Sequence, residues 1–285
     1  MIITRLFGGL GNQMFQYAAG RRLANKLSVE LKLDVNFLGK SGIRQYALGV
    51  FNIKESFASA QEISALAPKN KLTQAIAKRW PSHWPKYFQE KQFHFDPDIL
   101  KLPDDVYLKG YWQSEKYFSD IIPLIRKDFT FKIPQTGRNK ELAEIIASEQ
   151  SVSIHIRRGD YIAANKYHHI CNQDYYLRCE DYIEKTNRDV HFFVFSDDPE
   201  WAKNILRNIH RVTFISHNHN NDCEDMRLMS QCQHHIIANS TFSWWGAWLN
   251  ANKDKIVLAP KQWFADSTQT AIKLDDLCPN SWVLL

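Results

Sequence analysis

The stretch that decides the fold is VSIHIRRGDY, residues 152–161. Its first five residues form a mostly apolar run, and two arginines and a glycine follow at once. A short apolar strand that turns abruptly polar is typical of an inner strand in a parallel sheet, where ligands bind outside the carboxyl ends of the strands. We therefore predict a strand over 152–156 and a ligand-facing turn directly after it.

The rest of the second half repeats this plan. Apolar runs predict strands, and segments of about ten residues between them predict helices. Strands that alternate with helices imply a parallel sheet with right-handed crossovers. The further strands are expected at 191–195, 212–215, 235–238 and 255–259, and the helices at 175–184, 200–208, 223–232 and 242–250.

The first half is less regular. It predicts a strand over 2–6, a glycine turn, a helix, and further strands at 29–34 and 106–112, whereas 36–103 is irregular and partly helical. The polar stretch 134–150 separates the halves. The predicted fold class is α/β, with two α/β domains, 1–148 and 149–285, facing each other across a cleft.

Composition excludes several classes of protein. The 285 residues are 44% hydrophobic and 24% charged, which is typical of globular chains and excludes wholesale disorder or a small disulfide scaffold. No apolar run reaches the roughly 20 residues of a membrane span, and no secretory signal is evident, so we expect a cytoplasmic protein. We expect no disulfides among the five cysteines, which are Cys171, Cys179, Cys223, Cys232 and Cys278.

The charge is unevenly distributed. The formal net charge of +5 suits phosphates or anionic lipid but is low for a dedicated nucleic-acid domain. Residues 68–91 hold six lysines and arginines against one glutamate, interleaved with aromatic residues. Two interpretations stay open: a solvated basic face, or a patch that docks on the inner membrane surface as a peripheral contact.

The glycine turn GGLGNQ, residues 8–13, leads into the first helix. Glycines permit a tight turn with positive φ, and they also let backbone approach a ligand at a helix N-terminus. A dinucleotide fingerprint is the rival interpretation, with Asp34 as the ribose-binding acid of a nicotinamide-dependent oxidoreductase. Met14 stands where the third glycine of that fingerprint belongs and disfavours it.

Adjacent arginines after a strand point to different faces, so one is expected to reach a ligand while an acid such as Asp160 holds the other. The planar fork of a guanidinium matches phosphate oxygens, and we choose Arg157 for that role over Arg158. The alternative is a surface ion pair with Asp160.

Two other clusters invite metal-site interpretations. Asp197 and Asp198 close a strand and offer either metal ligands or, more simply, a helix N-cap before Pro199. Histidine and cysteine pairs near 168–171 and 217–223 fit no structural zinc spacing. We therefore predict no metal site.

The turn after the strand at 235–238 combines small hydroxyl residues with aromatic ones, in ANSTFSWWGA over 238–247. Hydroxyls and helix N-terminal amides converge in such a turn and make an anion cradle. Phe242, Trp244 and Trp245 are expected in the core for the most part.

Three of these segments, GGLGNQMFQYA, HIRRGDY and ANSTFSWWGA, stand in the order and approximate spacing of the bacterial α-1,2-fucosyltransferases, with GYWQSEKYF and FSDDPEW between them. The chain resembles that family over nearly its whole length. The resemblance implies a GT-B type fold of two Rossmann-like domains and inverting transfer of fucose from GDP-fucose to the 2-hydroxyl of a terminal β-galactoside, with no cofactor and no metal requirement. If the basic stretch 68–91 docks on the membrane, we expect the acceptor to be a lipid-linked O-antigen repeat unit.

The resemblance also implies residue roles. Arg157 would bind the β-phosphate and stabilise departing GDP, Asp160 would order the arginine loop, and Asn12 would face donor and acceptor. The donor-binding set would be His155, Arg158, Asp225, Asn239, Ser240, Thr241, Phe242 and Ser243, with His155 and Asp225 near the guanine. The acceptor-side set would be Gly9, Gly11 and Gln13. Neither composition nor resemblance identifies the general base, and a non-catalytic carbohydrate- or RNA-binding module is a third hypothesis.

Overall fold

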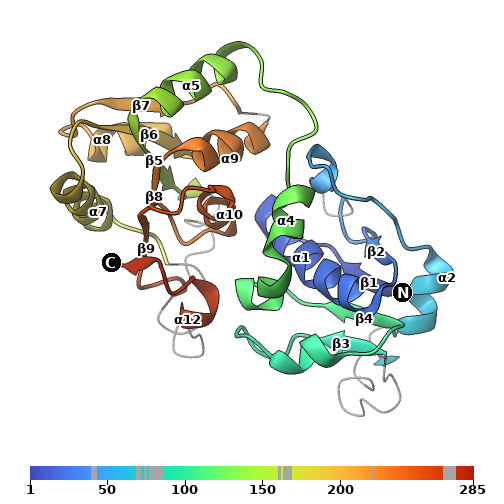
Figure 1. Cartoon of the computed structure of the whole chain (residues 1–285). Coiled ribbons are helices and arrows are strands. Elements are labelled where there is room, and N and C mark those ends of the chain that lie inside the picture. The colour runs from blue at the N-terminus through green and yellow to red at the C-terminus, as the bar shows by residue number, and fades with distance from the viewer. Residues whose placement is uncertain are drawn as a thin grey trace. The chain divides into compact units, whose positions relative to one another are not determined.

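Two parallel sheets organise the chain, and each belongs to its own unit, Met1–Ile133 or Pro134–Leu285 (Figure 1). The computed structural model describes residues 1–39, 44–68, 72–73, 76, 86–159, 162, 169–219, 221–265 and 274–285. The α/β fold class with parallel sheets is confirmed.

The second unit has a six-stranded sheet in the order β10-β9-β8-β5-β6-β7, and every described pairing in it is parallel. Its strands are β5 (Gln150–Ile156), β6 (Val190–Ser196), β7 (Val212–Ile215), β8 (His234–Ile236), β9 (Val257–Ala259) and β10 (Val283–Leu284). Its helices are α5 (Gly137–Ser148), α7 (Gln173–Thr186), α8 (Pro199–Ile205), α9 (Asp222–Gln231), α10 (Thr241–Leu249) and α12 (Leu274–Leu277).

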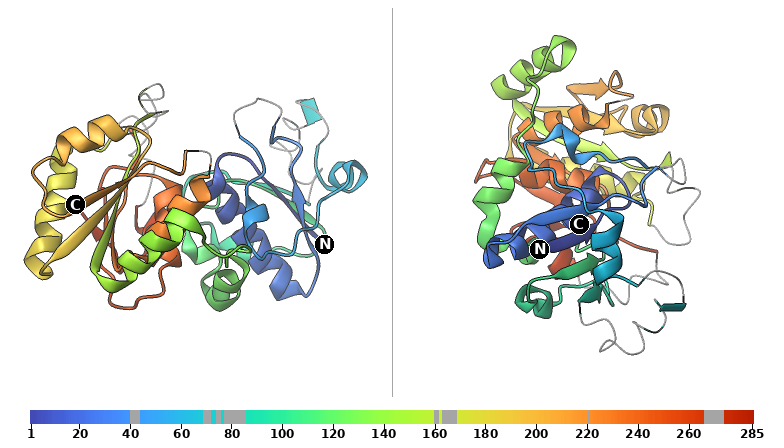
Figure 2. Two further views of the ribbon diagram at one scale, coloured as in Figure 1. Left: turned by 90° about the horizontal axis from the view of Figure 1, so that it is seen from above. Right: turned by 90° about the vertical axis from the view of Figure 1, so that its right-hand side faces the viewer.

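Helices cover both faces of this sheet (Figure 2). Val152, Ile154 and Ile156 of β5 are fully buried in a core cluster that includes residues of α7 and α8. The alternate residues of β5 point to the opposite face, as the period of two in a strand requires. His155 on that face contacts the Phe242 ring of α10, with ring centroids 5.6 Å apart.

The tryptophans of α10 belong to the core. Trp244 and Trp245 are fully buried and pack edge to face, with ring centroids 5.0 Å apart. The indole nitrogen of Trp244 donates to the carbonyl of Leu277 at 2.8 Å. The core prediction is confirmed for both tryptophans, which anchor the turn that precedes them, whereas Phe242 is only half-buried.

The first unit has a four-stranded parallel sheet in the order β2-β1-β4-β3. Its strands are β1 (Ile2–Arg5), β2 (Leu31–Asp34), β3 (Tyr87–Gln89) and β4 (Val106–Lys109). Its α-helices are α1 (Leu10–Leu27), α2 (Ala60–Leu66) and α4 (Ile122–Asp128), and its short 3-10 turns are η1 (Leu48–Val50), η3 (Pro97–Lys101), η4 (Glu115–Tyr117) and η5 (Ser119–Ile121).

Two predictions differ from the structure. The division between the units falls after Ile133 rather than after residue 148, because α5 packs on α9 and β5 within the second unit. The irregular segment before 103 contains the strand β3, which extends the first sheet by pairing with β4. Short strands such as β3 and β10 carry too few residues for an alternating pattern to stand out.

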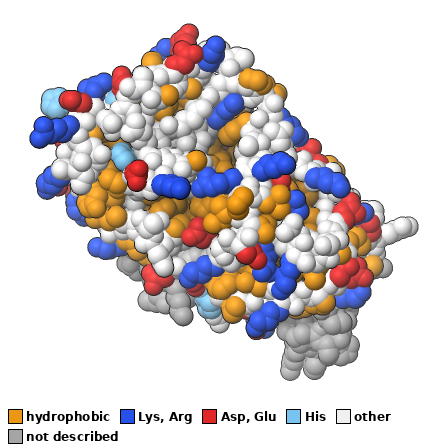
Figure 3. All heavy atoms as spheres, in the orientation of Figure 1, with side chains coloured by type: hydrophobic (Ala, Val, Ile, Leu, Met, Phe, Trp, Pro, Cys, Tyr) orange, Lys and Arg blue, Asp and Glu red, His pale blue; other side chains and the backbone are white. Residues whose placement is uncertain are grey.

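Most of the basic stretch 68–91 lies outside the described residues, including Lys69, Lys78 and Arg79. Of the described part, Lys86 forms an exposed ion pair with Asp105, and the Tyr87 ring stacks on Tyr107 with centroids 5.7 Å apart. The visible face of the molecule interleaves basic and acidic side chains with apolar patches (Figure 3). In the part of the chain that the structure describes, no helix is both long and apolar enough to span a membrane.

Candidate functional site

The order of the strands in the second unit marks a ligand position. The chain runs outward from β5 through β6 to β7, then returns by α9 to β8 on the other side of β5. Such a reversal leaves a crevice at the carboxyl ends of the two strands that flank it, and ligands of open α/β sheets bind there. Ligand-binding residues are therefore expected in the segments that follow β5 and β8.

An aspartate holds the arginine turn after β5. One Oδ of Asp197 accepts from the backbone N–H of Arg158 at 2.8 Å, and the other accepts from that of Gly159 at 3.0 Å. The second oxygen also pairs with Nη1 of Arg157 at 3.2 Å. Because Asp197 fixes both backbone and guanidinium, it orders Arg157 at the carboxyl edge of the sheet. Asp160, for which we predicted this role, lies outside the described residues.

Arg158 turns to the other face, as expected for adjacent residues. Its guanidinium lies over the Trp201 ring of α8, 4.0 Å from the centroid, and its Nε pairs with Asp198 at 3.2 Å. The other oxygen of that carboxylate accepts from the N–H of Trp201 and caps α8. The N-cap interpretation of Asp198 is confirmed, and Arg158 is engaged by packing and an ion pair rather than free for a donor.

His155 is the least satisfied polar group of this edge. The side chain is 6% exposed, and its buried Nδ1 has no hydrogen-bond partner among the described residues. Burial, with the neighbouring Arg157 charge as a smaller cause, lowers the pKa of His155 to about 3, so the ring is neutral at physiological pH. A buried unpaired ring nitrogen costs free energy that a ligand hydrogen bond would recover.

In the turn between β8 and α10, some polar side chains bond to the turn's own backbone and others are partly exposed. Ser240 caps α10, and its Oγ accepts from the N–H of Phe242 at 3.3 Å. The hydroxyl of Ser243 is 1% exposed and within reach of the carbonyls of Ala238 and Ser240, at 3.4 and 3.3 Å. Ser243 thus serves the turn itself, whereas Thr241 and Phe242 are only half-buried at the start of the helix.

Asn239 also differs from its predicted donor-binding role. Its Nδ2 donates to the carbonyls of His169 and Trp263, at 2.8 and 2.7 Å, and its side chain is 1% exposed. Both donors of the amide are therefore directed to backbone of the same unit. The residue fastens three segments together and positions the turn that follows it.

Asp225 lies in the first half of α9. Asn218 donates to its carboxylate at 2.8 Å, and Asn139 of α5 bonds to Asn218 in turn. Burial raises the pKa of Asp225 to about 6, although the Asn218 hydrogen bond lowers it. A carboxyl with this environment suits a partner that donates from uncharged N–H groups.

The glycine turn of the first unit is held by amides. Gly8 has a φ of 78°, so the positive-φ interpretation holds there, whereas Gly9 is the extended N-cap of α1 and Gly11 is buried inside that helix. The fully buried Gln13 donates to the carbonyls of Gly8 and Gln45, at 2.9 and 2.8 Å, and accepts from the N–H of Ala47. The side chain, which we predicted on the acceptor side, is therefore engaged in holding the turn.

Asn12 is engaged differently. Nε2 of Gln113, which follows β4, donates to its Oδ1 at 2.9 Å. The Oε1 of Gln113 is buried and has no partner within the described part of the chain. The two amides join the segments that follow β1 and β4, and β1 and β4 flank the reversal of strand order in this sheet.

The nicotinamide interpretation fails at Asp34. The residue is 1% exposed, and Tyr107 donates to one of its oxygens at 2.6 Å. The other oxygen accepts from the backbone and side-chain N–H groups of Asn36. A carboxylate so enclosed has no room for a ribose, and Met14 is fully buried where close helix packing would need glycine.

Sequence reasoning missed two features. It named Asp197 only as a possible metal ligand or cap, although its position after the strand next to β5 was enough to place it beside the arginines. It gave no role to Glu90, since nothing in the irregular segment distinguishes that residue. No group of three or more metal-ligating side chains is found over the described ranges.

Known proteins resemble this chain at two levels. The model of glycosyl transferase family 11 matches residues 1–285. An α-1,2-colitosyltransferase of Escherichia coli is 38% identical, with 99% of this chain and 98% of that protein covered, and the O-antigen biosynthesis glycosyltransferase WbnK of E. coli is 33% identical, with 98% and 99% covered.

Solved structures with low sequence identity to this chain resemble its fold. The fucosyltransferase NodZ from Bradyrhizobium superposes with a TM-score of 0.50 at 12% identity, covering 87% of this chain and 92% of that one. This likeness shows the fold alone, and the family match over the full chain and the two E. coli relatives show the family. The chain belongs to glycosyl transferase family 11.

Proposed function

We propose that the protein transfers L-fucose from GDP-fucose to the 2-hydroxyl of a terminal β-galactoside, with inversion at the sugar carbon and without a metal ion. The main support is the carboxyl edge of β5, where a neutral, buried imidazole with an unpaired nitrogen lies two residues before an arginine ordered by Asp197. A neutral ring nitrogen suits a nucleobase, and a guanidinium suits a diphosphate.

In this reaction the departure of GDP needs the most stabilisation. The bond between the fucose carbon and the β-phosphate oxygen breaks, and its electron pair stays on GDP. The acceptor oxygen forms the new bond, and the proton of its hydroxyl passes to water. Charge then accumulates on the diphosphate. A preorganised cation gains strength at that moment because it needs no reorientation, and Asp197 supplies the preorganisation of Arg157.

The relatives suggest a biological setting. One is named for O-antigen biosynthesis and the other for α-1,2 transfer of colitose. Colitose is fucose without its 3-hydroxyl, so a site for one sugar needs little change to accept the other. We infer a lipid-linked O-antigen repeat unit as the natural acceptor, and fucose as the donor sugar on the strength of the three ordered motifs.

The test is a transfer assay with purified protein and lactose in EDTA, using GDP-fucose and GDP-colitose in parallel. We expect GDP release and a product whose new linkage, assigned by NMR, is α-1,2 to galactose. Transfer of colitose alone would show that the donor is GDP-colitose rather than GDP-fucose. Absence of product with either donor and any terminal galactoside would overturn the function, and activity restored only by added Mg²⁺ would overturn the metal independence.

The membrane contact is a separate part of the proposal. The basic stretch 68–91 would hold the protein peripherally at the inner membrane face. Replacing Lys78, Arg79 and Lys86 by alanine should release the protein from anionic vesicles and leave lactose fucosylation intact. Unchanged vesicle binding would contradict the proposed membrane contact.

A further inference from the structure

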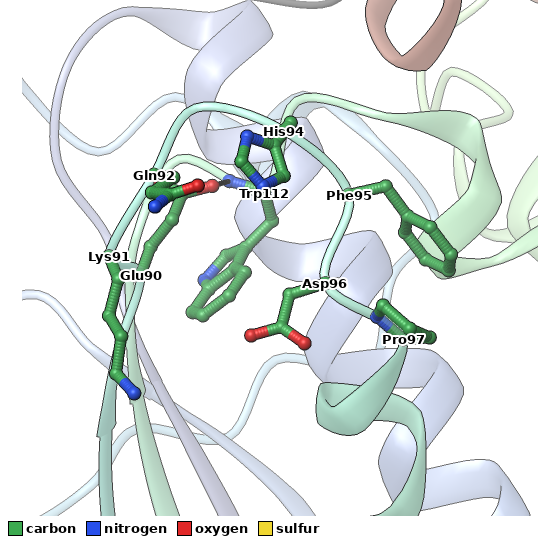
Figure 4. A pocket seen from close by; sticks show the side chains of 8 residues that line it. All are labelled: Glu90, Lys91, Gln92, His94, Phe95, Asp96, Pro97 and Trp112. Atoms are coloured by element: carbon green, nitrogen blue, oxygen red, sulfur yellow. Dashed lines mark hydrogen bonds between the residues drawn. The ribbon is translucent and has the colours of Figure 1, made fainter. Parts of the chain in front are cut away.

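A cavity of about 270 Å³ lies at the carboxyl edge of the first unit's sheet. Residues after β3, from Glu90 to Pro97, form most of its wall, and Trp112 after β4 completes it. Figure 4 shows the indole of Trp112 between Glu90 on one side and the carboxylate of Asp96 on the other, with His94 above. Pockets for drug-sized ligands span about 300–1,000 Å³, so this cavity has room for about one sugar ring.

The backbone here is shaped to present the indole. Trp112 has a φ of 55°, in the left-handed region that residues other than glycine rarely adopt. A Cβ on Gly110 would lie 2.5 Å from Cβ of Glu90 and 2.7 Å from the Trp112 ring. Only glycine lets the strand end, the carboxyl and the indole meet so closely, so a substitution here would push the cavity wall apart.

Glu90 fixes this conformation. Its two carboxyl oxygens accept from the backbone N–H groups of Tyr111 and Trp112, at 2.7 and 3.1 Å. Burial raises the pKa of Glu90 to about 7 and outweighs the two hydrogen bonds, which lower it. Glu90 thus supports the wall, and near neutral pH it carries only part of a negative charge.

Two polar groups at the cavity can make further hydrogen bonds. The indole nitrogen of Trp112 is buried without a hydrogen-bond partner in the described chain, and the side chain is fully buried. One oxygen of Asp96 accepts from the N–H of Asp98, and the carboxyl group has further lone pairs that can accept hydrogen bonds. The hydroxyl of Tyr117 accepts from the N–H of Asp96 at 2.9 Å and holds the backbone beside it.

The chemistry of the wall selects a class of ligand. Asp96 and the partly charged Glu90 offset the single lysine of the wall, Lys91, so the wall has no excess positive charge for a phosphate. Glu90 already uses both oxygens on backbone, which disfavours a cation site. Among the described residues, no three metal-ligating side chains gather here. An aromatic ring with hydroxyl-binding groups on either side fits a neutral polyhydroxylated ring, which offers apolar C–H groups as well as O–H donors.

We propose that the cavity walled by Asp96, His94 and Trp112 binds the terminal hexopyranose ring of the acceptor and sets acceptor specificity. The inference rests on the proposed function for the identity of the ring, a galactoside. Asp96 accepts hydroxyl hydrogen bonds, the Trp112 N–H is matched by a sugar oxygen, and the GYWQSEKYF motif gains a role as the segment that supplies the indole.

The experiment compares Asp96→Asn with Asp98→Asn. Asparagine at 96 keeps an oxygen for the N–H of Asp98 but replaces an acceptor with a donor. Asp98 is 80% exposed in an ion pair with Lys101 and is not part of the wall, so Asp98→Asn is the matched control. Trp112→Phe removes the indole N–H and keeps an aromatic ring.

We expect the acceptor KM to rise about tenfold in Asp96→Asn and Trp112→Phe, with the donor KM within twofold of wild type, and Asp98→Asn to be unchanged. Saturation-transfer NMR with methyl β-galactoside alone should give a signal in wild type that both variants lose. An unchanged acceptor KM and an undiminished NMR signal in the two folded variants would overturn the proposal. So would a galactoside signal absent from wild type.

The NMR arm also separates this inference from the proposed function. If the protein binds galactoside through this cavity but neither binds GDP nor transfers fucose, the proposed function fails and the sugar subsite stands. If transfer proceeds and the two wall variants keep wild-type acceptor KM, the function stands and the subsite fails. Circular dichroism spectra check that Trp112→Phe has folded.

Discussion

The carboxyl edges of the two sheets have the same plan and opposite chemistry. In the second unit, two arginines follow the central strand and two aspartates fix them. In the first unit, amides and one carboxyl take the corresponding places, with Asn12 bonded to Gln113 and Glu90 bonded to backbone. A parallel sheet supplies the position of a site, and the side chains that follow its strands decide which ligand that position suits.

The comparison also separates side chains that can bind a ligand from side chains that hold the local backbone in place. Gln13, Asn239 and Ser243 lie in the motifs that carry the family resemblance, yet their side chains bond to backbone of their own unit. His155 lies in the same kind of motif and keeps a buried nitrogen unpaired. The predictions below test this division, starting from the largest expected effect.

Arg157→Ala should lower kcat by about 10²–10³-fold, because the cation that neutralises the leaving diphosphate is lost. The galactoside NMR signal should not change, since that sugar is assigned to the other unit. Arg211→Ala is the matched control, because Arg211 precedes β7 and pairs with Glu149 with its side chain 48% exposed. Near-wild-type turnover of Arg157→Ala would show that the charged edge is not the donor site.

Gln13→Ala should lower the free energy of unfolding by about 2–3 kcal/mol, since two carbonyls and one N–H lose a buried partner. Gln61→Ala on the exposed side of α2 should change it by less than about 0.5 kcal/mol. Thermal and urea unfolding measure both. Equal stability of the two variants would contradict the structural role given to Gln13.

Asp197→Asn should lower kcat by about tenfold, or about 1.4 kcal/mol in the barrier. Asparagine has one oxygen for the two backbone N–H groups and turns an N–H toward Arg157. Asp181→Asn is the control, because Asp181 forms only an exposed pair with Lys185 on α7. A rate for Asp197→Asn equal to that of the control would mean that Arg157 needs no ordering.

His155→Phe should weaken GDP binding about fivefold, the equivalent of one neutral hydrogen bond of about 1 kcal/mol. Phenylalanine keeps a buried ring against Phe242 and lacks the ring nitrogen. Calorimetric titration with GDP measures the change, and UDP serves as the control ligand. If GDP binds both proteins equally, the unpaired nitrogen has another purpose.

Glu90 should give a pH dependence of opposite sign to that of an ordinary surface acid. Its pKa is raised from 4.5 to about 7 by burial, so between these values the folded state keeps a proton that the unfolded state has lost. Its contribution to stability is therefore largest below pH 4.5 and falls as the pH rises to about 7.

Urea unfolding at several pH values tests this assignment. The difference in unfolding free energy between wild type and Glu90→Gln should decrease over the window from pH 4.5 to 7. A constant difference would show that Glu90 titrates normally.

The amino-acid sequence was enough to predict five strands and four helices of the second unit, because long apolar runs and regular spacing carry that signal locally, whereas the short elements β10 and α12 were not predicted. It also predicted that Arg157 lies at the carboxyl edge of the sheet, since a charged residue at the end of a buried strand has a known place in a parallel sheet, and the role of Arg157 toward a donor stays a prediction. The tertiary structure alone decided which polar residues of the motifs are already satisfied, because Gln13 and Asn239 find their partners on segments distant in sequence. Only the tertiary structure shows that Glu90 contacts the backbone of Trp112. The close approach at Gly110 and the positive φ of Trp112 produce no periodic pattern in the sequence.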